Sequence, residues 1–333
     1  MKISYDDLYS LMKEKLIGHN CPENLATRVA NNMASSSRDG VLSHGVYRFE
    51  RLIKMIDSGV VKPANRPTLV RSLGAFEVWD GNSGLGNTNA EDMINRAIEM
   101  ADKYGIGCTS LIHTNHWMRG GAFGAIAAEK GYAAICWTNT IANMAPWGAL
   151  DNAIGNNPLV MAVPYHDSYV LYDGAMSQFS YGALEKAMIA DKKLSVPGGF
   201  DEEGKLSNDP KEITKTGRVL PMGFWKGSSL SILMDMIVSS ISGGYCVPDI
   251  KNQGNTPETE TNLSQIFIVL KVDNKTISDE TISRIVAQIK NCIPVDSSSE
   301  VRYPSENLLK IRQKSLTEGI EITDDVYNRI CNL

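Results

Sequence analysis

The 333-residue chain is 43% apolar and 21% charged, the composition of a folded globular protein, and its length allows one large domain or two to three packed ones. Its formal net charge is −5 and no block of Lys and Arg occurs, which excludes the basic surface that nucleic-acid binding needs. The N-terminus has no hydrophobic signal core, and no run of about 18 apolar residues predicts a membrane helix. The six cysteines are scattered without a CxxC pair, as reduced thiols are. We therefore expect a cytoplasmic protein without nucleic-acid or membrane partners.

The first part of the chain, residues 4–57, is predicted to be helical. Ser4 and Asp7 have the spacing of a capping box, and Pro22 is placed to open a second helix. A third helix is predicted after Ser43, because apolar residues recur there at helical spacing until Gly59.

From residue 68 onwards, strands and helices alternate. The predicted strands cover residues 68–73, 75–79, 105–112, 132–139, 158–164, 168–173 and 266–272. The predicted helices cover residues 91–104, 120–130, 228–242, 278–291 and 305–318, of which 228–242 is expected to be buried. Polar stretches at 195–218 and 251–261 are predicted to be loops. The mixture indicates an α/β or mixed α+β fold.

A glycine-rich stretch, Gly81-Asn-Ser-Gly-Leu-Gly-Asn-Thr-Asn89, lies between a predicted strand and a helix. A Rossmann fingerprint requires Gly or Ala where Asn89 stands, and the acidic residue about 20 positions later, Asp102, falls in a helix instead of a second parallel strand. We therefore interpret this stretch as a turn before a helix.

A second glycine-containing stretch, Gly223–Ser228, resembles a phosphate loop with its lysine on the wrong side of the glycine, which argues against a nucleoside triphosphatase. The backbone amides of Gly227 and Ser228, reinforced by Lys226, could still bind a phosphate at the start of a helix. Alternatively, Lys226 is a solvated side chain at a helix entry.

Two of the five histidines, His113 and His116, are spaced as metal ligands can be, but no Cys, Asp or Glu lies close to them in sequence. We therefore predict no metal site. His19 and His166 are placed in turns and are expected at the surface. Trp117, Met118 and Trp147 are candidates either for apolar walls of a pocket or for the core.

Ser43, His44 and Arg48 combine the groups needed to reduce a 2-keto acid. Arg48 can clamp a carboxylate in bidentate fashion, and His44 can hydrogen-bond a carbonyl and deliver a proton. At the start of a helix, His44 and Arg48 would lie on one face at i,i+4 spacing. The alternative, a capping serine beside a histidine with structural partners, remains open at this point.

Several unusual blocks identify a family. The chain resembles the malate/L-lactate dehydrogenase family, which is unrelated to Rossmann-type lactate dehydrogenases, over essentially its whole length. The matching blocks include Ser43-His-Gly-Val-Tyr-Arg-Phe49, Asn115-His-Trp-Met-Arg-Gly-Gly121, Met176-Ser-Gln-Phe-Ser-Tyr-Gly182 and Leu220-Pro-Met-Gly-Phe-Trp-Lys-Gly-Ser228. The resemblance implies a helical part, placed at residues 1–66 and 278–333, and a largely antiparallel mixed-sheet domain at 67–277 that binds a nicotinamide cofactor. It also implies homodimers in which both subunits contribute to each active site.

The resemblance assigns roles to particular residues. His44 matches the catalytic acid, Ser43 and Arg48 match adjoining substrate positions, and His116 matches a second active-site histidine that serves as the acid–base group in some members. Asn139 lies where a substrate contact is expected. The expected cofactor contacts are Tyr169, Val170, Leu171, Tyr172, Asp173, Gly174, Ala175, Trp225, Lys226, Ser305, Glu306 and Asn307.

Two departures from the family pattern lie in these cofactor stretches. A smaller residue follows Asp173 and one residue is inserted nearby, and Pro304-Ser-Glu replaces the more common Pro-Gly-Glu. We expect NADH as cofactor, with NADPH possible, and a sugar-derived 2,3-diketo acid as substrate. The alternatives are malate, lactate, ureidoglycolate or a cyclic imino acid, a binding protein that has lost catalysis, or a metal-dependent hydrolase.

Overall fold

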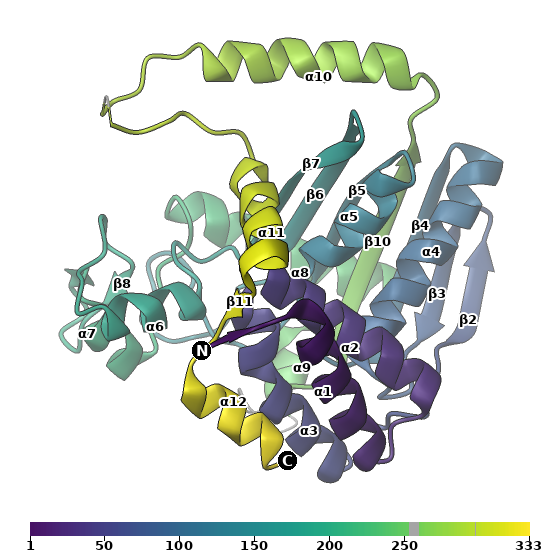
Figure 1. Cartoon of the computed structure of the whole chain (residues 1–333), viewed down its shortest axis with the longest axis horizontal. Coiled ribbons are helices and arrows are strands. Elements are labelled where there is room, and N and C mark those ends of the chain that lie inside the picture. Colours follow the sequence, from purple (N-terminus) through teal and green to yellow (C-terminus); the bar gives the residue numbers. More distant parts are fainter. Residues whose placement is uncertain (253–259, 297) are drawn as a thin grey trace.

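The strands after residue 68 form one seven-stranded sheet in the order β2-β3-β4-β10-β5-β6-β7 (Figure 1). We describe residues 1–252, 260–296 and 298–333 of a computed structural model. All neighbouring strands are antiparallel except β3 and β4. This confirms the expected mixed sheet, which differs from the parallel sheet of a Rossmann fold. The strands are β2 (Thr68–Leu73), β3 (Phe76–Asp80), β4 (Ile106–Thr114), β5 (Tyr132–Thr138), β6 (Leu159–Tyr165), β7 (Ser168–Gly174) and β10 (Leu263–Lys271).

Helices cover both faces of the sheet. Side chains of α4 (Gly86–Tyr104) and α5 (Gly121–Glu129) pack on one face with Phe267 and Val269 of β10. Side chains of α8 (Trp225–Ser242) pack on the other face with Ile266 and Ile268. Because both faces of β10 are covered, its residues 266–270 are continuously apolar instead of alternating.

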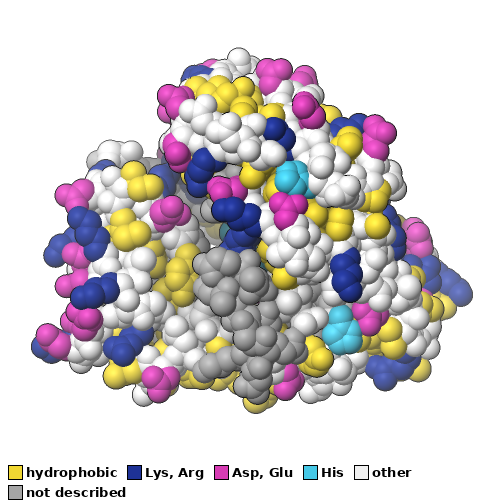
Figure 2. All heavy atoms as spheres, turned by 90° about the horizontal axis from the view of Figure 1, so that it is seen from below, with side chains coloured by type: hydrophobic (Ala, Val, Ile, Leu, Met, Phe, Trp, Pro, Cys, Tyr) yellow, Lys and Arg dark blue, Asp and Glu magenta, His cyan; other side chains and the backbone are white. Residues whose placement is uncertain are grey.

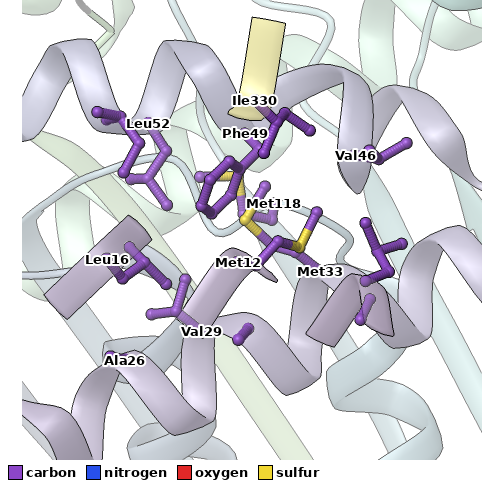
Figure 3. Close-up of a cluster of buried hydrophobic side chains, with 14 of the residues drawn as sticks. Met12, Leu16, Ala26, Val29, Met33, Val46, Phe49, Leu52, Met118 and Ile330 are labelled. Carbon is purple, nitrogen blue, oxygen red and sulfur yellow. The ribbon is translucent and has the colours of Figure 1, made fainter. Parts of the chain in front are cut away.

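The N-terminal helices α1 (Tyr5–Gly18), α2 (Glu23–Arg38) and α3 (Phe49–Asp57) enclose a separate core (Figure 3). As predicted, Ser4 caps α1, accepting a hydrogen bond from the backbone N–H of Asp7 at 3.0 Å. The end of the chain completes this core: β11 (Ile320–Glu321) pairs with β1 (Lys2–Ile3), and α12 (Asp324–Cys331) adds Val326 and Ile330. Neither β11 nor α12 was predicted.

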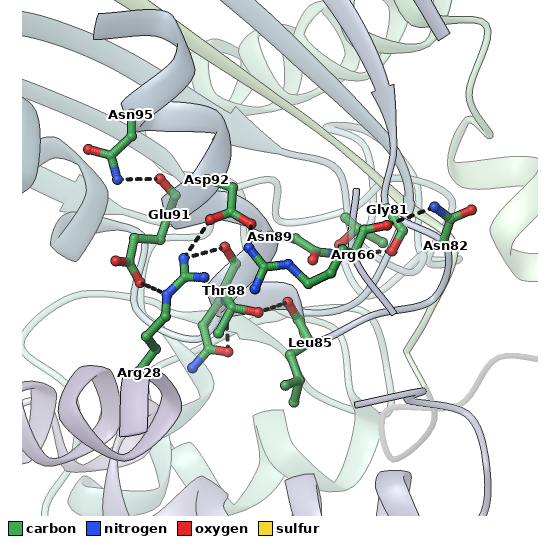
Figure 4. Close-up of polar contacts among 12 residues, drawn as sticks. Arg28, Arg66, Gly81, Asn82, Leu85, Thr88, Asn89, Glu91, Asp92 and Asn95 are labelled. Carbon is green, nitrogen blue, oxygen red and sulfur yellow. Dashed lines mark hydrogen bonds and ion pairs between the residues drawn. The ribbon is translucent and has the colours of Figure 1, made fainter. Parts of the chain in front are cut away.

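An arginine cluster fastens the N-terminal helices to the sheet domain (Figure 4). Arg28 of α2 donates to Glu91 at 3.1 Å and to Asp92 at 2.7 Å, both on α4, and also to the carbonyl of Thr88. Arg66 reaches the other carboxylate oxygen of Asp92 at 2.7 Å. These contacts fix α2, and the segment between α3 and β2 that carries Arg66, against the N-terminal half of α4.

The helices α10 (Lys275–Lys290) and α11 (Glu306–Glu318) connect β10 to the chain end. α10 lies across one end of the sheet (Figure 1), and none of its described side chains is buried. α11 returns to the N-terminal helices and contacts α2. The domain boundaries expected at residues 66/67 and 277/278 stay a prediction.

The stretch 195–218 is not the loop that its polar composition predicts. It contains the hairpin β8 (Gly199–Phe200) and β9 (Leu206–Ser207) and the helix α7 (Pro210–Thr216). Asp209 caps α7, Pro210 occupies its first turn, and the buried Ile213 anchors it. The preceding helix α6 (Tyr181–Ile189) was also missed. Of the loop predicted over 251–261, residues 251–252 end α9 (Val247–Asn252) and residues 253–259 lie outside the described part.

The helix predicted to be buried at 228–242 is buried on one side only. Met234 and Val238 of α8 face the sheet, whereas Leu230, Leu233, Met236 and Ile237 are 44–57% exposed. The apolar spacing was therefore correct for a helix but wrong for burial within this chain. These four residues form the stripe that we call the α8 apolar face.

The described surface carries mixed charge. On the face in Figure 2, Lys and Arg are interspersed with Asp and Glu, without a broad basic area among the residues drawn. Among the described helices, none has the length and apolarity needed to cross a bilayer. All six cysteines are free, as expected for reduced thiols.

Candidate active site

The segment that carries Ser43, His44 and Arg48 consists of two short 3-10 turns, Leu42–His44 and Val46–Arg48, ahead of α3. The expected single helix, with His44 and Arg48 on one face, is therefore a wrong prediction. The two turns meet at Gly45, which packs directly on α2: a Cβ there would lie 2.2 Å from Ser37 Oγ. The backbone amide of the next residue donates to that same hydroxyl at 2.9 Å. Close packing thus replaces the helix with a tighter bend.

Two histidines from distant parts of the chain meet at this bend. The rings of His44 and His116 are stacked, with centroids 5.7 Å apart and planes 16° from parallel. His44 Nδ1 lies 3.1 Å from Ser43 Oγ. Both rings are partly accessible to solvent, and Ser43 is exposed. The first residues of α6 approach as well, since a Cβ on Gly182 would lie 3.1 Å from Ser43 Cβ.

A strained turn after β4 fixes the orientation of His116. Met118 has φ of 63°, an unusual conformation for a residue with a side chain, and its N–H donates to His116 Nδ1 at 3.0 Å. The Met118 side chain is buried in the N-terminal helical core (Figure 3). Because Nδ1 accepts this bond, neutral His116 carries its proton on Nε2. The turn therefore presents one defined N–H donor.

The electrostatics of the site keep both imidazoles neutral. Burial, and then the positive charges of Arg48 and Arg119, lower the pKa of His44 to about 4. Burial, followed by the charges of Arg48 and other neighbours, holds the pKa of His116 well below its usual value. Neutral rings beside fixed cations make this a place where an anion is favoured.

Arg48 itself stays charged. Burial lowers its pKa to about 10, with Arg51 adding to the decrease and Glu260 opposing it. Arg48 Nη2 lies 3.7 Å from Glu260 Oε2, and the other Glu260 oxygen accepts the backbone N–H of Ile141 at 3.1 Å. At neutral pH the guanidinium therefore remains charged, with the planar shape that suits a carboxylate, close to the two imidazoles.

Asn139 is fully buried, and its amide is engaged within the chain. Its Nδ2 donates to Asp235 at 3.0 Å and to the carbonyl of Tyr245 at 2.8 Å, while its Oδ1 accepts the N–H of Ser264 at 2.7 Å. A substrate contact would have to break one of these bonds. The expected substrate contact of Asn139 stays a prediction.

Two of the three expected cofactor stretches, Tyr169–Ala175 and Ser305–Asn307, are in contact along β7, an edge strand of the sheet. Ser305 Oγ accepts the N–H of Leu171 at 3.1 Å, and its single hydrogen is shared between the carbonyls of Pro304 at 2.6 Å and Tyr169 at 3.3 Å. The hydroxyl of Tyr172, also on β7, donates to Met222 Sδ at 3.9 Å, and Met222 precedes the third stretch, Trp225–Lys226, by three residues. The remaining residues of these stretches are Val170, Asp173, Gly174, Ala175, Glu306 and Asn307.

The phosphate site expected at Gly227 and Ser228 is not available in the form predicted. The helix begins earlier, at Trp225, so these residues lie inside its first turn. The Gly227 amide donates to the carbonyl of Met222 at 2.8 Å, and the Ser228 amide donates to that of Phe224 at 3.3 Å. Trp225 is 59% exposed, and Lys226 is exposed.

The histidines other than His44 and His116 have structural partners. His113 Nδ1 lies 2.8 Å from Asp80 Oδ2, and His19 contacts Asp57 at 2.7 Å. Within the ranges described, His, Cys, Asp and Glu form no cluster of three or more that could hold a metal ion. Trp117 and Met118 belong to the core, whereas Trp147 is 47% exposed and packs on Phe224.

Sequence reasoning missed the residues that support the histidines. Met118 was considered only as a pocket wall or a core residue, and Arg119, Asp39 and Glu260 were not singled out. Each acts through a partner far away in the sequence, so local spacing carries no signal for them. The block Asn115–Gly121 pointed to this turn as a unit.

Comparison with known proteins shows the family to which the chain belongs. The sequence profile described as malate/L-lactate dehydrogenase matches residues 3–331. The chain belongs to the malate/L-lactate dehydrogenase family and is an oxidoreductase.

One curated relative and two solved structures are similar to the chain over its whole length. A 2,3-diketo-L-gulonate reductase from Pasteurella multocida (strain Pm70) is 41% identical over 336 residues, covering 100% of both chains. The structure of sulfolactate dehydrogenase from Methanocaldococcus jannaschii is similar with a TM-score of 0.90 and 26% identity, covering 100% of this chain and 97% of that one. Malate dehydrogenase from Entamoeba histolytica has the same fold, with a TM-score of 0.93 and 23% identity over 100% and 96% of the chains.

Proposed function

We propose that the protein reduces 2,3-diketo-L-gulonate to 3-keto-L-gulonate with NADH. The observation that carries the proposal is the stacked pair His44–His116 beside the charged Arg48, which supplies a carboxylate binder and two hydrogen-bonding imidazoles in one place. The substrate is inferred from full-length relatives at 41% identity that are named for it.

In the proposed mechanism the chain holds the keto acid while a bound nicotinamide cofactor supplies the hydride. Arg48 binds the carboxylate, and its planar guanidinium fixes the direction of the neighbouring carbonyl. The Nε2–H of His116 donates a hydrogen bond to the substrate and orients it. His44 delivers the proton to the oxygen that becomes a hydroxyl.

The low pKa of His44 is consistent with this role. A pKa of about 4 belongs to the site without substrate, where the charges of Arg48 and Arg119 oppose protonation of the ring. A bound carboxylate neutralises part of that charge, so substrate binding raises the pKa of His44 towards the working pH. Protonation of His44 is thereby coupled to the presence of the substrate.

The residues along β7 fit a nicotinamide dinucleotide. The outer edge of β7 offers backbone groups, Lys226 offers a positive charge for the phosphates, and the exposed rings of Trp147, Phe224 and Trp225 offer flat apolar surface. We propose that Tyr169–Ala175, Trp225–Lys226 and Ser305–Asn307 hold the cofactor, with NADH preferred over NADPH.

We also propose a homodimer that works in the cytoplasm. The α8 apolar face is exposed, and the edge strand β2 beside it exposes Leu69, Val70 and Leu73 by 50–60%. Arg71 of β2 donates to the carbonyl of Ile241 on α8, so the two elements are neighbours. Exposed apolar surface of this extent, including a bare sheet edge, is usually covered by a partner.

The proposal is tested by NADH oxidation at 340 nm with a panel of 2-keto acids, run in parallel with NADPH. The panel contains 2,3-diketo-L-gulonate, pyruvate, oxaloacetate and a cyclic imino acid, with ureidoglycolate plus NAD in the oxidative direction. The expected result is the highest kcat/KM for 2,3-diketo-L-gulonate with NADH. A higher value for another compound replaces the substrate, and no turnover with any compound contradicts the proposed function.

A further inference from the structure

The carboxylate of Asp39, at the end of α2, is shared by three arginines. Arg312 binds it in bidentate fashion through Nε and Nη2, both at 2.8 Å. Arg119 Nη1 donates at 2.7 Å and Arg38 Nε at 2.9 Å. The Asp39 side chain is 2% exposed, and these arginines hold its pKa at about 2 despite its burial.

Two of these arginines connect Asp39 to the two parts of the proposed site, the turn that holds His116 and strand β7. Arg119 directly follows Met118, whose N–H fixes His116. Arg312, on α11, donates through Nη2 to the hydroxyl of Tyr169 at 2.7 Å, and Tyr169 lies on β7 among the expected cofactor contacts. Asp39 is therefore the common acceptor between the His116 turn and the cofactor strand.

The arrangement is not explained by stability alone. A buried ion pair often contributes little net stability, because desolvation of the charges offsets their attraction. Here one buried carboxylate faces three guanidiniums and joins elements that lie up to 273 residues apart. Such a contact fixes a geometry, since moving Arg119 or Arg312 removes some of the hydrogen bonds that compensate the buried charge of Asp39.

We propose that Asp39 is a positioning residue that sets the His116 turn and strand β7 relative to each other through Arg119 and Arg312. The inference rests on the proposed function, which assigns the His116 turn to the substrate and strand β7 to the cofactor. It adds a residue remote from the substrate that controls the distance and angle between the proton-donating rings and the cofactor. Errors of about 1 Å in such geometry can cost on the order of 100-fold in rate.

The chain contains a matched control for loss of a buried ion pair. Glu77 of β3 is 3% exposed and binds Arg96 in bidentate fashion at 2.7 and 2.9 Å. It lies on the opposite side of the sheet order from β7. Glu77→Gln removes a comparable charge without touching the proposed site, so it reports the effect of lost stability alone.

The experiment compares Asp39→Asn with Glu77→Gln in the full chain. Three quantities are measured: kcat, the Kd for NADH from fluorescence titration, and the 15N signal of His116 Nδ1, which five histidines make assignable. For Asp39→Asn we expect kcat to fall about 10- to 100-fold, NADH to bind more weakly, and the acceptor-type signal of Nδ1 to be lost. Glu77→Gln should leave all three quantities at their wild-type values.

Milder variants separate the two halves and remain informative if Asp39→Asn does not fold. Arg312→Lys keeps the charge but loses the bidentate fork and the Tyr169 contact, so NADH should bind about tenfold more weakly while the His116 signal stays unchanged. Arg119→Lys should shift the His116 signal while NADH binding is retained.

The outcomes are distinct. The positioning role is overturned if Asp39→Asn and Glu77→Gln give equal kcat, NADH Kd and His116 signal. It is also overturned if Arg312→Lys leaves NADH binding unchanged or Arg119→Lys leaves the His116 signal unchanged. A wild-type protein that turns over no keto acid contradicts the proposed function, while the NADH Kd and the His116 signal still support or overturn the role of Asp39.

Discussion

His44 and His116 lie face to face, yet their surroundings differ. His116 is held by the backbone of Met118, which leaves a single ring nitrogen for the substrate. His44 contacts the hydroxyl of the exposed Ser43, a group that can rotate and accept or donate. A rigid ring suits orientation of a substrate and an adaptable one suits proton delivery, which is why we assign the proton to His44.

His44→Ala is expected to lower kcat by about 10²- to 10⁴-fold, because general acid catalysis is lost, while the Kd for NADH changes little. Steady-state kinetics and fluorescence titration measure the two quantities. The control is His166→Ala, since the His166 side chain is 60% exposed and contacts Asp279. Near-normal turnover of His44→Ala, with a large loss in His116→Ala, would mean that the two histidines exchange roles.

Among the elements, α11 is preceded by an N-cap residue, Ser305, with a left-handed backbone conformation. Ser305 has φ of 67°, a conformation that glycine adopts without strain, and the family resemblance leads us to expect glycine at this place. The serine compensates by bonding to the backbone of β7 at Leu171 and Tyr169. The serine therefore exchanges backbone freedom for a direct link between α11 and β7, the strand that we propose binds the cofactor.

Ser305→Ala should lower the free energy of unfolding by about 1 kcal/mol, since it loses the hydrogen bonds and keeps the strain. Ser305→Gly should be close to neutral, because relief of the strain offsets the same loss. Urea denaturation of the two variants measures the difference. Equal destabilisation by alanine and glycine would show that the strain contributes nothing.

The α8 apolar face is where we propose that two copies of the chain meet. Leu233→Glu should convert the proposed dimer to a monomer, because it places a charge in the interface. Ile285→Glu on α10 is the control, since Ile285 is 55% exposed and Leu233 53%. Light scattering after size-exclusion chromatography measures the mass. A Leu233→Glu variant with the wild-type mass contradicts the placement of the interface on α8.

At the scale of the whole molecule, the neutral histidines make stability depend on pH. The pKa of His44 is about 4 in the folded protein and about 6.5 when unfolded, so between these values the unfolded chain binds the extra proton. Stability should fall as pH decreases from 6.5 to 4, by roughly 2–3 kcal/mol for His44, with His116 acting in the same direction.

Urea denaturation between pH 7 and pH 4.5 measures how the free energy of unfolding changes with pH, and His44→Gln should reduce that change. An unchanged pH dependence in His44→Gln would contradict the low pKa of His44.

Asp39 affects stability over a different pH range. Its folded pKa of about 2 lies below its usual value of 3.8, so its contribution is present above pH 3.8 and is lost only as pH falls towards 2.

The sequence alone predicts the seven strands of the main sheet and the two segments that carry His44 and His116, and its family resemblance implies the mixed sheet. Local spacing predicts a strand or a helix because side-chain periodicity follows the backbone, and β10 and α8 were found in this way. The blocks around His44 and His116 indicated the family and its chemistry. Residues 195–218 were misread because two short strands and a seven-residue helix carry too few apolar residues to show a period.

Contacts between residues that are distant in the sequence are set by the tertiary structure. Periodicity marks an apolar stripe on α8 but does not say whether this chain or a partner covers it. Gly45 turns a predicted helix into two bends because α2 leaves no room for a Cβ, and that packing partner is remote in sequence. Asp39 meets Arg312 across 273 residues. The chemistry of a residue is local and can be read from the chain, whereas its partner and its pKa depend on neighbours that only folding supplies.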